Sequence, residues 1–514
     1  MTLARLTCLV ATALVLLPVS AATAAAQTAT CRKTDKAETG LQGEMTQAEV
    51  DSGANAKPIN CNVDLVGQYQ GEGASWQLTA WKNCAYFDQR KGTNLANPGT
   101  VVMDVSNPSK PVPTAYLQDP AMLDPWESLK VNPQRQLLAA DQGTYGSPGP
   151  GFSIYDISAD CKHPVLKSSV NISGSLGHTG QWAPDGNTYY ITTIAQTSAA
   201  MVAVDTKDAA NPQPLLLYTA PSNISASFHD LEFSKDGNIA YVGGIGGFGG
   251  SAANGLIILD VSDIQSRKAN PQVRVLSTLT WDDGSIVSQN ALPVTIAGKQ
   301  YILYTDEAGS ASISGTCTAN KSGQGFPRLI DVSDPKNPTT VAKLMMQIAA
   351  PENCAQSIAL KMTPTTQTFG YSCHYCAVDD VDNAKIAACN CFAAGLRIWD
   401  ISNPAAPVEK GYYKSPAQGT KIFPGSQYGS GGGFGPPASF SRPIDWASSK
   451  PSFPKDRGMT SGDIWTTSQD NGFEVVHYAA AGGGGCSTGG GAFGALGVAL
   501  AFFLQRRRRR GSNG

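Results

Sequence analysis

Residues 396–407 read Leu396-Arg-Ile-Trp-Asp-Ile-Ser-Asn-Pro-Ala-Ala-Pro407, and the chain repeats this pattern. The other copies are Val101-Val-Met-Asp-Val-Ser-Asn-Pro108, Ser153-Ile-Tyr-Asp-Ile-Ser158, Val202-Ala-Val-Asp205, Ile257-Ile-Leu-Asp-Val-Ser-Asp263 and Leu329-Ile-Asp-Val-Ser-Asp-Pro335. Their aspartates are spaced by 52, 49, 55, 71 and 69 residues. Self-similarity at such a period is typical of a propeller or a solenoid.

Each copy has the composition of a β-hairpin. A β-branched or aromatic run predicts one strand. Asp, Ser and Asn bond their own backbone in turns, and Pro presets φ, so the Asp-x-Ser-Asn-Pro segment predicts the connection. A second apolar run, such as residues 408–413, then predicts the returning strand.

This repeated unit resembles the LVIVD-repeat β-propeller family, and the resemblance covers roughly residues 60–480. It implies an all-β fold of four-stranded blades. It implies little about function, because one architecture hosts many activities.

The ends of the repeat region predict how the ring closes. Residues 63–69 match a returning strand, although no Asp-x-Ser-Asn-Pro strand precedes them. Residues 463–467 and 473–478 form two strands with nothing returning afterwards. Pairing 63–70 with 473–478 would remove two open edges. We therefore expect a seven-bladed propeller over residues 61–480, with six motif-bearing blades and one composite blade.

The two termini indicate export. Residues 1–26 have an early charge, an apolar stretch and a run of small residues, as in a signal peptide. Residues 27–60 are polar and are expected to form a leader along the outside.

Residues 481–514 contain a Gly-rich stretch around Cys486, a short apolar segment (492–504) and five arginines. This tail resembles the myxobacterial C-terminal sorting signal, which implies cleavage near Cys486 and attachment to the cell surface or outer membrane. The alternative is an ordinary transmembrane tail anchor, although the apolar run is short for a span.

Charge limits the partners of the exported body. Without Arg5 and the five tail arginines, 32 basic side chains face 40 acidic ones. The resulting net charge argues against nucleic acid and against anionic membrane surfaces. We expect a monomer that meets the membrane only through its tail and binds a protein or glycan at the cell surface.

Ten cysteines remain once Cys8 and Cys486 are set aside, an even number typical of an oxidising compartment. Cys373 with Cys391 and Cys376 with Cys389 would face each other across one hairpin turning near residue 382. We predict these two disulfides, holding a protruding hairpin, and a third between Cys317 and Cys354. The alternative is a four-cysteine zinc site beside His374. The pairing of the remaining four cannot be assigned, and these are Cys31, Cys61, Cys84 and Cys161.

Upstream of each motif, a polar residue is followed four positions later by an apolar one, and residues four apart on a strand share a face. If these segments are the inner strands, the polar residues form a ring at one channel mouth: Gln77, Glu127, His178, His229, Asn290, Gln356 and Arg442. The apolar residues would form a deeper level that plugs the channel: Trp81, Val131, Trp182, Phe233, Val294, Leu360 and Trp446.

The polar ring has two interpretations. It could simply be a channel lining that tolerates water. Alternatively Glu127, His178 and His229, on successive blades, could hold one divalent ion such as Zn, Mn or Fe. Arg442 could then clamp an anionic group.

Long insertions suggest a binding face. They are residues 89–99, 243–255, 309–325 and 372–394, all expected between second and third strands, and the blade link 415–441. Long loops gathered on one face usually carry function. Two hypotheses follow, a surface-displayed binding module acting through this loop face and a metal-dependent hydrolase or lyase with its site at the channel mouth.

Overall fold

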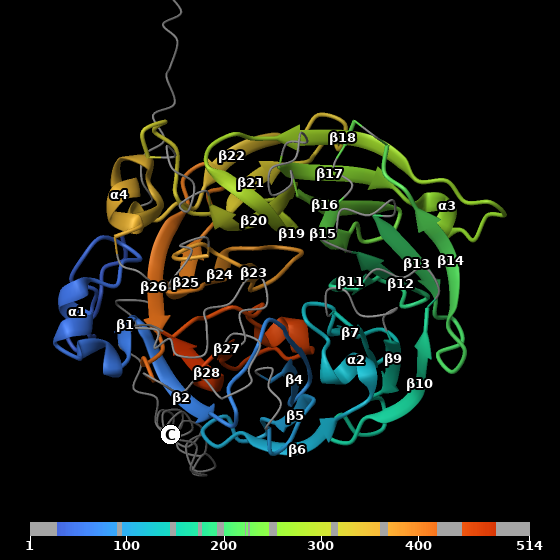
Figure 1. Ribbon diagram of the computed structural model, residues 1–514, viewed down its shortest axis with the longest axis horizontal. Helices are drawn as coiled ribbons and strands as arrows, with labels where there is room; N and C mark the ends of the chain where they lie inside the picture. The colour runs from blue at the N-terminus through green and yellow to red at the C-terminus, as the bar shows by residue number, and fades with distance from the viewer. Residues whose placement is uncertain are drawn as a thin grey trace, which may run out of the picture.

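The computed structural model describes residues 28–89, 95–143, 151–172, 177–192, 200–221, 223–224, 227–245, 254–309, 317–359, 369–418 and 445–479. Within these ranges seven antiparallel sheets surround one axis, which makes the fold a seven-bladed β-propeller (Figure 1). The same ranges contain no helix long and apolar enough to cross a membrane. The predicted signal peptide and sorting tail, with Cys486, lie outside the described residues.

Blades 1 to 5 each contain four strands in sequence order, from the axis outward. Blade 1 contains β3 (Leu78–Trp81), β4 (Cys84–Asp88), β5 (Thr100–Asp104) and β6 (Val112–Leu117). Blade 2 contains β7 (Lys130–Asn132), β8 (Leu137–Asp141), β9 (Gly151–Asp156) and β10 (Val165–Asn171). Blade 3 contains β11 (Thr179–Trp182), β12 (Thr188–Thr192), β13 (Met201–Asp205) and β14 (Gln213–Tyr218). Blade 4 contains β15 (Ser227–Phe233), β16 (Ile239–Ile245), β17 (Gly255–Asp260) and β18 (Arg274–Thr280). Blade 5 contains β19 (Ser285–Ile296), β20 (Lys299–Gly309), β21 (Arg328–Asp331) and β22 (Thr339–Lys343).

Blades 6 and 7 include strands from the start of the chain. Blade 6 contains β23 (Tyr375–Val378), β24 (Ile386–Cys391), β25 (Gly395–Asp400), β26 (Val408–Lys414) and, as a fifth outer strand, β1 (Ile59–Cys61). Blade 7 contains β27 (Ile464–Ser468), β28 (Gly472–Tyr478) and β2 (Val63–Tyr69), with an isolated bridge from Ala447 to Ser468 on its inner side.

Ring closure follows the predicted pairing. Strand β2 pairs with β28 from Val63 opposite Tyr478 to Tyr69 opposite Phe473. The first strand of the repeat region thus completes the last blade.

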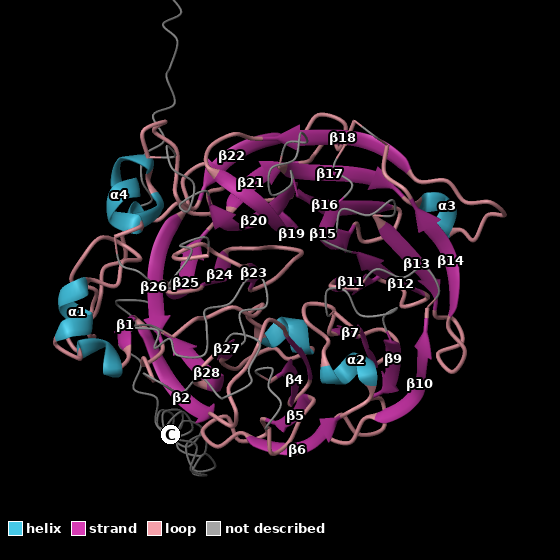
Figure 2. Ribbon diagram, viewed as in Figure 1, coloured by secondary structure: helices cyan, strands magenta, loops and turns pink. Residues whose placement is uncertain are grey.

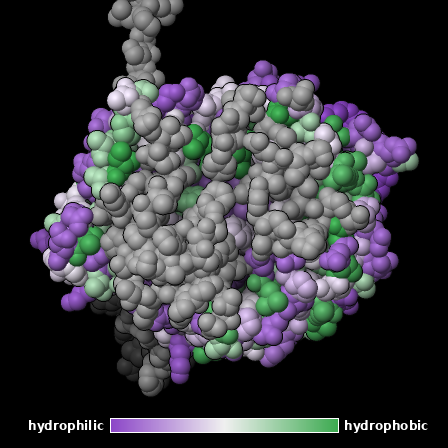
Figure 3. All heavy atoms as spheres, in the orientation of Figure 1, coloured by the Kyte–Doolittle hydropathy of each residue, from purple (hydrophilic) through white to green (hydrophobic). Residues whose placement is uncertain are grey.

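Helices are short; α1, α3 and α4 lie outside the ring of blades, and α2 packs against β8 and β9 of blade 2 (Figure 2). They are α1 (Gln47–Asp51), α2 (Pro120–Leu123), α3 (Ser262–Gln265) and α4 (Cys354–Ser357), with 3-10 turns η1 (Ala54–Ala56), η2 (Gln347–Ala349), η3 (Pro351–Asn353) and η4 (Pro454–Arg457). Where described residues are visible, the rim of the ring is mostly hydrophilic, with separate hydrophobic patches (Figure 3).

The repeated motif forms the third strand of blades 1 to 6 and the turn after it. In blade 6, the Asp400 carboxylate accepts hydrogen bonds from the Ser402 amide (3.0 Å) and hydroxyl (2.6 Å). The same two bonds join Asp104 to Ser106 in blade 1. The motif therefore recurs because a side-chain-to-backbone turn ends each third strand.

Hydrophobic clusters fill the spaces between neighbouring blades. Between blades 7 and 1, for example, Phe87 and Val101 pack with Trp465, Phe473 and Val475. A comparable cluster separates blades 3 and 4, where Tyr190 packs with Phe233. Each blade is therefore stabilised chiefly by its two neighbours.

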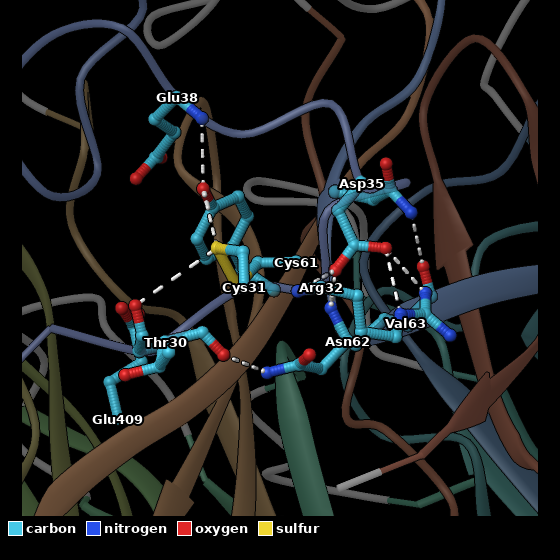
Figure 4. Close-up of a disulfide and its surroundings, with 12 residues drawn as sticks. Thr30, Cys31, Arg32, Asp35, Glu38, Cys61, Asn62, Val63 and Glu409 are labelled. Carbon is cyan, nitrogen blue, oxygen red and sulfur yellow. Dashed lines mark hydrogen bonds and ion pairs between the residues drawn. A yellow bond between two sulfur atoms is a disulfide. The ribbon is translucent and has the colours of Figure 1, made fainter. Parts of the chain in front are cut away.

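The leader packs against the outside of blade 6 (Figure 1). A disulfide joins Cys31 to Cys61 beside the Arg32–Asp35 ion pair (Figure 4). Deeper in this contact, Glu38 binds both Arg397 (2.8 Å) and Lys414 (2.7 Å).

The described part of the chain contains five disulfides. Cys373–Cys391, Cys376–Cys389 and Cys317–Cys354 are the three predicted pairs, and Cys31–Cys61 and Cys84–Cys161 are the two left unassigned. This disulfide content indicates an exported protein.

Two details of the disulfide and loop predictions are wrong. The hairpin that carries Cys373 and Cys391 does not protrude, because it forms β23 and β24 and is buried. Residues 372–394 are therefore not an insertion between second and third strands, unlike 89–99, 243–255 and 309–325.

Candidate metal site on the propeller axis

Five ionisable side chains from five successive blades converge on the propeller axis. They are Glu127, His178, His229, Glu307 and His374, and all five are buried. Two overlapping sets of possible metal ligands share Glu127, one with His178 and His229 and the other with Glu307 and His374. Within each set the ligand atoms lie within 4.8 Å of one another.

Four of these side chains form a closed ring. His374 Nε2 lies 3.2 Å from Glu127 Oε1 and 3.3 Å from Glu307 Oε2. His229 completes the ring, with Nε2 3.3 Å from Glu307 Oε1 and Nδ1 3.6 Å from Glu127 Oε2. His178 Nε2 lies next to the ring, 4.0 Å from Glu127 Oε2.

Backbone irregularities aim the histidines at the axis. His178 has a φ of 145°, a region that L-residues rarely adopt, immediately before β11. In blade 4 a β-bulge sets His229 and Asp230 opposite the single Gly243. Bulges often re-aim side chains next to functional sites, and such strain persists only where surrounding structure imposes it.

The cluster holds opposite charges together without solvent. Burial opposes ionisation of Glu127, but the imidazoles of His374 and His229 outweigh it and lower its pKa well below its ordinary value. Burial also opposes protonation of His374, yet Glu127 and Glu307 raise the pKa of His374 to about 10. Burial lowers the pKa of His178 to about 4, so this imidazole is neutral at pH 7. A bound cation would supply positive charge in place of the His374 proton.

A second layer of polar groups orients these side chains. Gln289 donates to Glu127 Oε2 at 2.7 Å, and the Tyr375 hydroxyl lies 3.2 Å from the same oxygen. The Tyr375 hydroxyl also donates to Asp230 at 2.8 Å. His374 Nδ1 bonds the Ser448 carbonyl, which leaves Nε2 facing the cluster. A metal-binding histidine commonly has such a partner on its other nitrogen.

The residues present fit a transition-metal ion. Among the described residues, neither His374 Nε2 nor His229 Nδ1 has a hydrogen-bond partner of good geometry, although both atoms are buried. Three imidazoles with one or two carboxylates match the ligands that Zn, Mn and Fe accept.

The predicted ring of seven residues is only partly reproduced. Gln77 and Asn290 are buried near the axis, where Gln77 donates to the Glu127 carbonyl and Asn290 lies 3.3 Å from Asp230. Gln356 is not on an inner strand, because it lies on α4 and binds Glu44 of the leader. Arg442 lies outside the described residues.

The predicted apolar level deeper in the channel is only partly reproduced, because Trp81 and Val131 line a cavity there but Phe233 and Trp182 do not. After the bulge in β15, Phe233 packs between blades against Tyr190, and Glu232 lines the channel instead. Trp182 likewise packs against Tyr189 between blades. The reason is physical, because a shift of one residue exchanges the two faces of a strand. Leu360 lies outside the described residues.

Sequence reasoning missed Glu307 and considered His374 only beside the alternative four-cysteine zinc site. The four-cysteine zinc alternative fails because all four cysteines are in disulfides. A usable signal existed for His374, which precedes Asp400 by 26 residues. In blades 1 to 4, the ring residue precedes the motif aspartate by 27, 29, 27 and 31 residues. Glu307 gave no such signal, since it lies on a second strand.

The fold and the axial cluster together define a seven-bladed propeller with a buried histidine–carboxylate centre. The family model described as LVIVD repeat matches residues 96–114 and 390–415. The two matched segments, which lie in blades 1 and 6, are similar to LVIVD repeats. No match was found among curated proteins.

Several solved structures resemble the chain at low identity. A protein of unknown function from Desulfotomaculum acetoxidans aligns at 12% identity and a TM-score of 0.40, covering 66% of this chain and 84% of its own. The periplasmic gluconolactonase of Pseudomonas aeruginosa aligns at 12% identity and a TM-score of 0.45, covering 79% and 99%. A hypothetical selenium-binding protein from Sulfolobus tokodaii aligns at 13% and 0.39, covering 66% and 74%. These likenesses are too remote to bear on function.

Proposed function

We propose that this exported propeller is a metalloprotein that binds one divalent transition-metal ion on its axis and acts as a hydrolase or lyase. The observation that carries the proposal is the buried convergence of three imidazoles and two carboxylates from five blades. His178, His229 and His374 would hold the ion together with Glu127 and Glu307.

Folding alone gives no reason to place these groups there. Removing ionisable groups from water costs several kcal/mol per ion, and apolar residues of similar size often stabilise a fold at least as well. Strongly perturbed ionisable groups gather at functional sites for this reason. The cluster is therefore better explained by binding than by stability.

When bound, the ion would lower the pKa of a coordinated water or polarise a substrate oxygen. The protein's own groups supply orientation. Gln289 and Tyr375 fix the Glu127 carboxylate, and the Ser448 carbonyl fixes the His374 ring. An enclosed polar site also excludes bulk water, which strengthens every electrostatic interaction in it.

Metal content of the purified protein tests the proposal. We expect about one equivalent of Zn, Mn or Fe in the wild type, and its loss in His374→Ala and in His178→Ala. The matched control is His163→Ala, because His163 is an exposed residue paired only with Asp160 among the described residues. A metal-free wild type, or metal retained in both cluster variants, would overturn the proposal.

Surface display is a second, separate part of the proposed function. The insertions 89–99, 243–255 and 309–325 each follow the second strand of a blade. In an antiparallel blade the second strand ends on the side of the ring where the first strand begins, and the cluster lies on that side. We propose that this loop face meets a protein or glycan while the tail, residues 481–514, anchors the body. Cell fractionation with and without residues 481–514 tests the anchoring. Equal release of both forms into the medium would contradict it.

A further inference from the structure

A cavity occupies the end of the channel opposite the metal cluster. It has a volume of about 470 Å³, within the usual range for small-ligand sites. Its walls come from the far halves of several inner strands and are largely apolar, including Leu78, Val131, Leu292 and Val378. None of the five cluster residues lines it.

The inner end of this cavity is charged. Lys130 binds Asp230 at 3.0 Å, and Lys450 binds Glu232 at 2.8 Å. The side chain of Lys130 is 6% exposed and that of Lys450 is 22% exposed. Both lysines and Glu232 line the cavity.

The two carboxylates already have several donors. Besides Lys450, Glu232 accepts from Gln181 at 2.9 Å and from Asn290 at 3.5 Å. Besides Lys130, Asp230 accepts from the Tyr375 hydroxyl and from Asn290. Their capacity to bind a further donor is therefore largely used.

The ammonium groups of Lys130 and Lys450, in contrast to the two carboxylates, have unused hydrogen-bonding capacity. Each carries three N–H donors. Among the described residues, Lys130 and Lys450 each donate one hydrogen bond, to Asp230 and Glu232 respectively. Around Lys130 and Lys450 the spare hydrogen-bonding capacity therefore consists of cationic donors, which favour an anionic acceptor over an ammonium ligand. The Asp456 carboxylate also lines the cavity, where it accepts from the Phe453 amide.

We propose that this cavity binds a small amphiphilic monocarboxylate, with the carboxylate on Lys450 and Lys130 and the apolar body between Leu78, Val131, Leu292 and Val378. A mostly apolar cavity with a few polar groups at one end is the usual form of such a site. The inference does not depend on the proposed metal site.

Titration calorimetry with octanoate tests the inference, with octanol and octylammonium as head-group controls of the same length. We expect octanoate to bind wild type stoichiometrically and the two controls to bind at least about tenfold more weakly, because a charge-assisted hydrogen bond is lost. Lys450→Met should weaken octanoate binding by a similar factor. Lys235→Met is the matched control, since Lys235 pairs on the surface with Asp382.

A second measurement does not need a lysine variant. Trp81 lines the cavity, so 8-bromo-octanoate should quench its fluorescence, and Trp81→Phe should remove that quenching. His374→Ala should leave octanoate binding unchanged, which separates this site from the metal centre. Equal binding of octanol, no quenching of Trp81, or full affinity in folded Lys450→Met would overturn the inference.

Discussion

His178 combines an unusual backbone conformation with a buried imidazole on the propeller axis. Its φ of 145° is strained for a side chain larger than glycine, and burial lowers its pKa to about 4. A neutral imidazole held in one orientation is the form that binds metal. The residue thus carries the features expected of a ligand before any ion is considered.

Tyr375 provides a test at the residue scale. Its hydroxyl contacts both Glu127 and Asp230, so Tyr375→Phe should loosen the Glu127 carboxylate and weaken metal binding about tenfold. The control is Tyr190→Phe, which removes a buried hydroxyl with no hydrogen-bond partner among the described residues. Competition with a fluorescent chelator measures both affinities. Equal affinities in the two variants would contradict an orienting role for Tyr375.

The sequence could indicate some of these residues but not their full set. Glu127, His178 and His229 were predictable because each lies at or just before the start of an inner strand, at a similar distance from its motif. His374 was obscured by the surrounding cysteines, although its spacing from Asp400 is equivalent. Glu307 was not predictable, because only the tertiary fold brings the end of β20 to the axis.

Among the elements, blade 6 contains buried cations whose ion-pair partner lies in the leader, a contact that the polar composition of the leader did not predict. Arg397 and Lys414 are almost fully buried and share Glu38 as an ion-pair partner. Residues 28–58 are therefore more than a covering of the outer strand, since Glu38 supplies an ion-pair partner to two buried cations.

Glu38→Gln tests this contact. Removing one partner of a buried ion pair typically lowers the free energy of unfolding by 3–5 kcal/mol, and we expect about 3 kcal/mol because Arg397 keeps Glu409. The control Glu352→Gln changes an exposed side chain and should have little effect. Equilibrium denaturation with urea measures both variants. A change below about 1 kcal/mol for Glu38→Gln would place this pair among weak surface contacts.

Blade 7 contains a carboxyl group that should make stability depend on pH. Burial raises the pKa of Glu474 to about 8 from its ordinary 4.5, although Ser415 donates to it at 2.6 Å. The folded state therefore favours the protonated form. Its contribution to stability is fully present below about pH 4.5 and is lost as the pH rises through about 8.

Unfolding measured from pH 4 to 9 in wild type and Glu474→Gln separates this contribution from those of other groups. The free energy of unfolding of the variant, relative to that of wild type, should rise as the pH increases. Glutamine stays neutral, whereas ionisation of the buried Glu474 destabilises the wild type. A constant difference across the range would show that Glu474 does not titrate in this way.

The β-bulge in β15 explains why the alternation of residues along this strand did not predict which side chains line the channel. Alternation along a strand predicted two levels in the channel, and the bulge in β15 shifts the faces after His229. A bulge depends on pairing with a partner strand, so the sequence of one strand does not reveal it. At this depth Lys130, Gln181 and Glu232 therefore line the channel together with apolar residues such as Trp81 and Val131.

At the scale of the whole molecule, repeat counting was sufficient for the architecture. Six motif copies, one unmatched strand at the start of the repeat region and two at its end predicted seven blades, and β2 closes the ring on β28. Closure brings residues from blades 2 to 6 to one axis, although they are separated by as many as 247 positions between Glu127 and His374. The candidate centre is therefore a property of the closed ring.

The central claim is that this closed ring holds a transition-metal ion on its axis. Anomalous diffraction from crystals of the protein, recorded at the absorption edge of the metal found by elemental analysis, tests it directly. We predict one strong anomalous peak on the axis, about 2.0–2.2 Å from the imidazole nitrogens and carboxylate oxygens that bind it. An axis without an anomalous peak, in crystals whose metal is bound only elsewhere, would contradict the account.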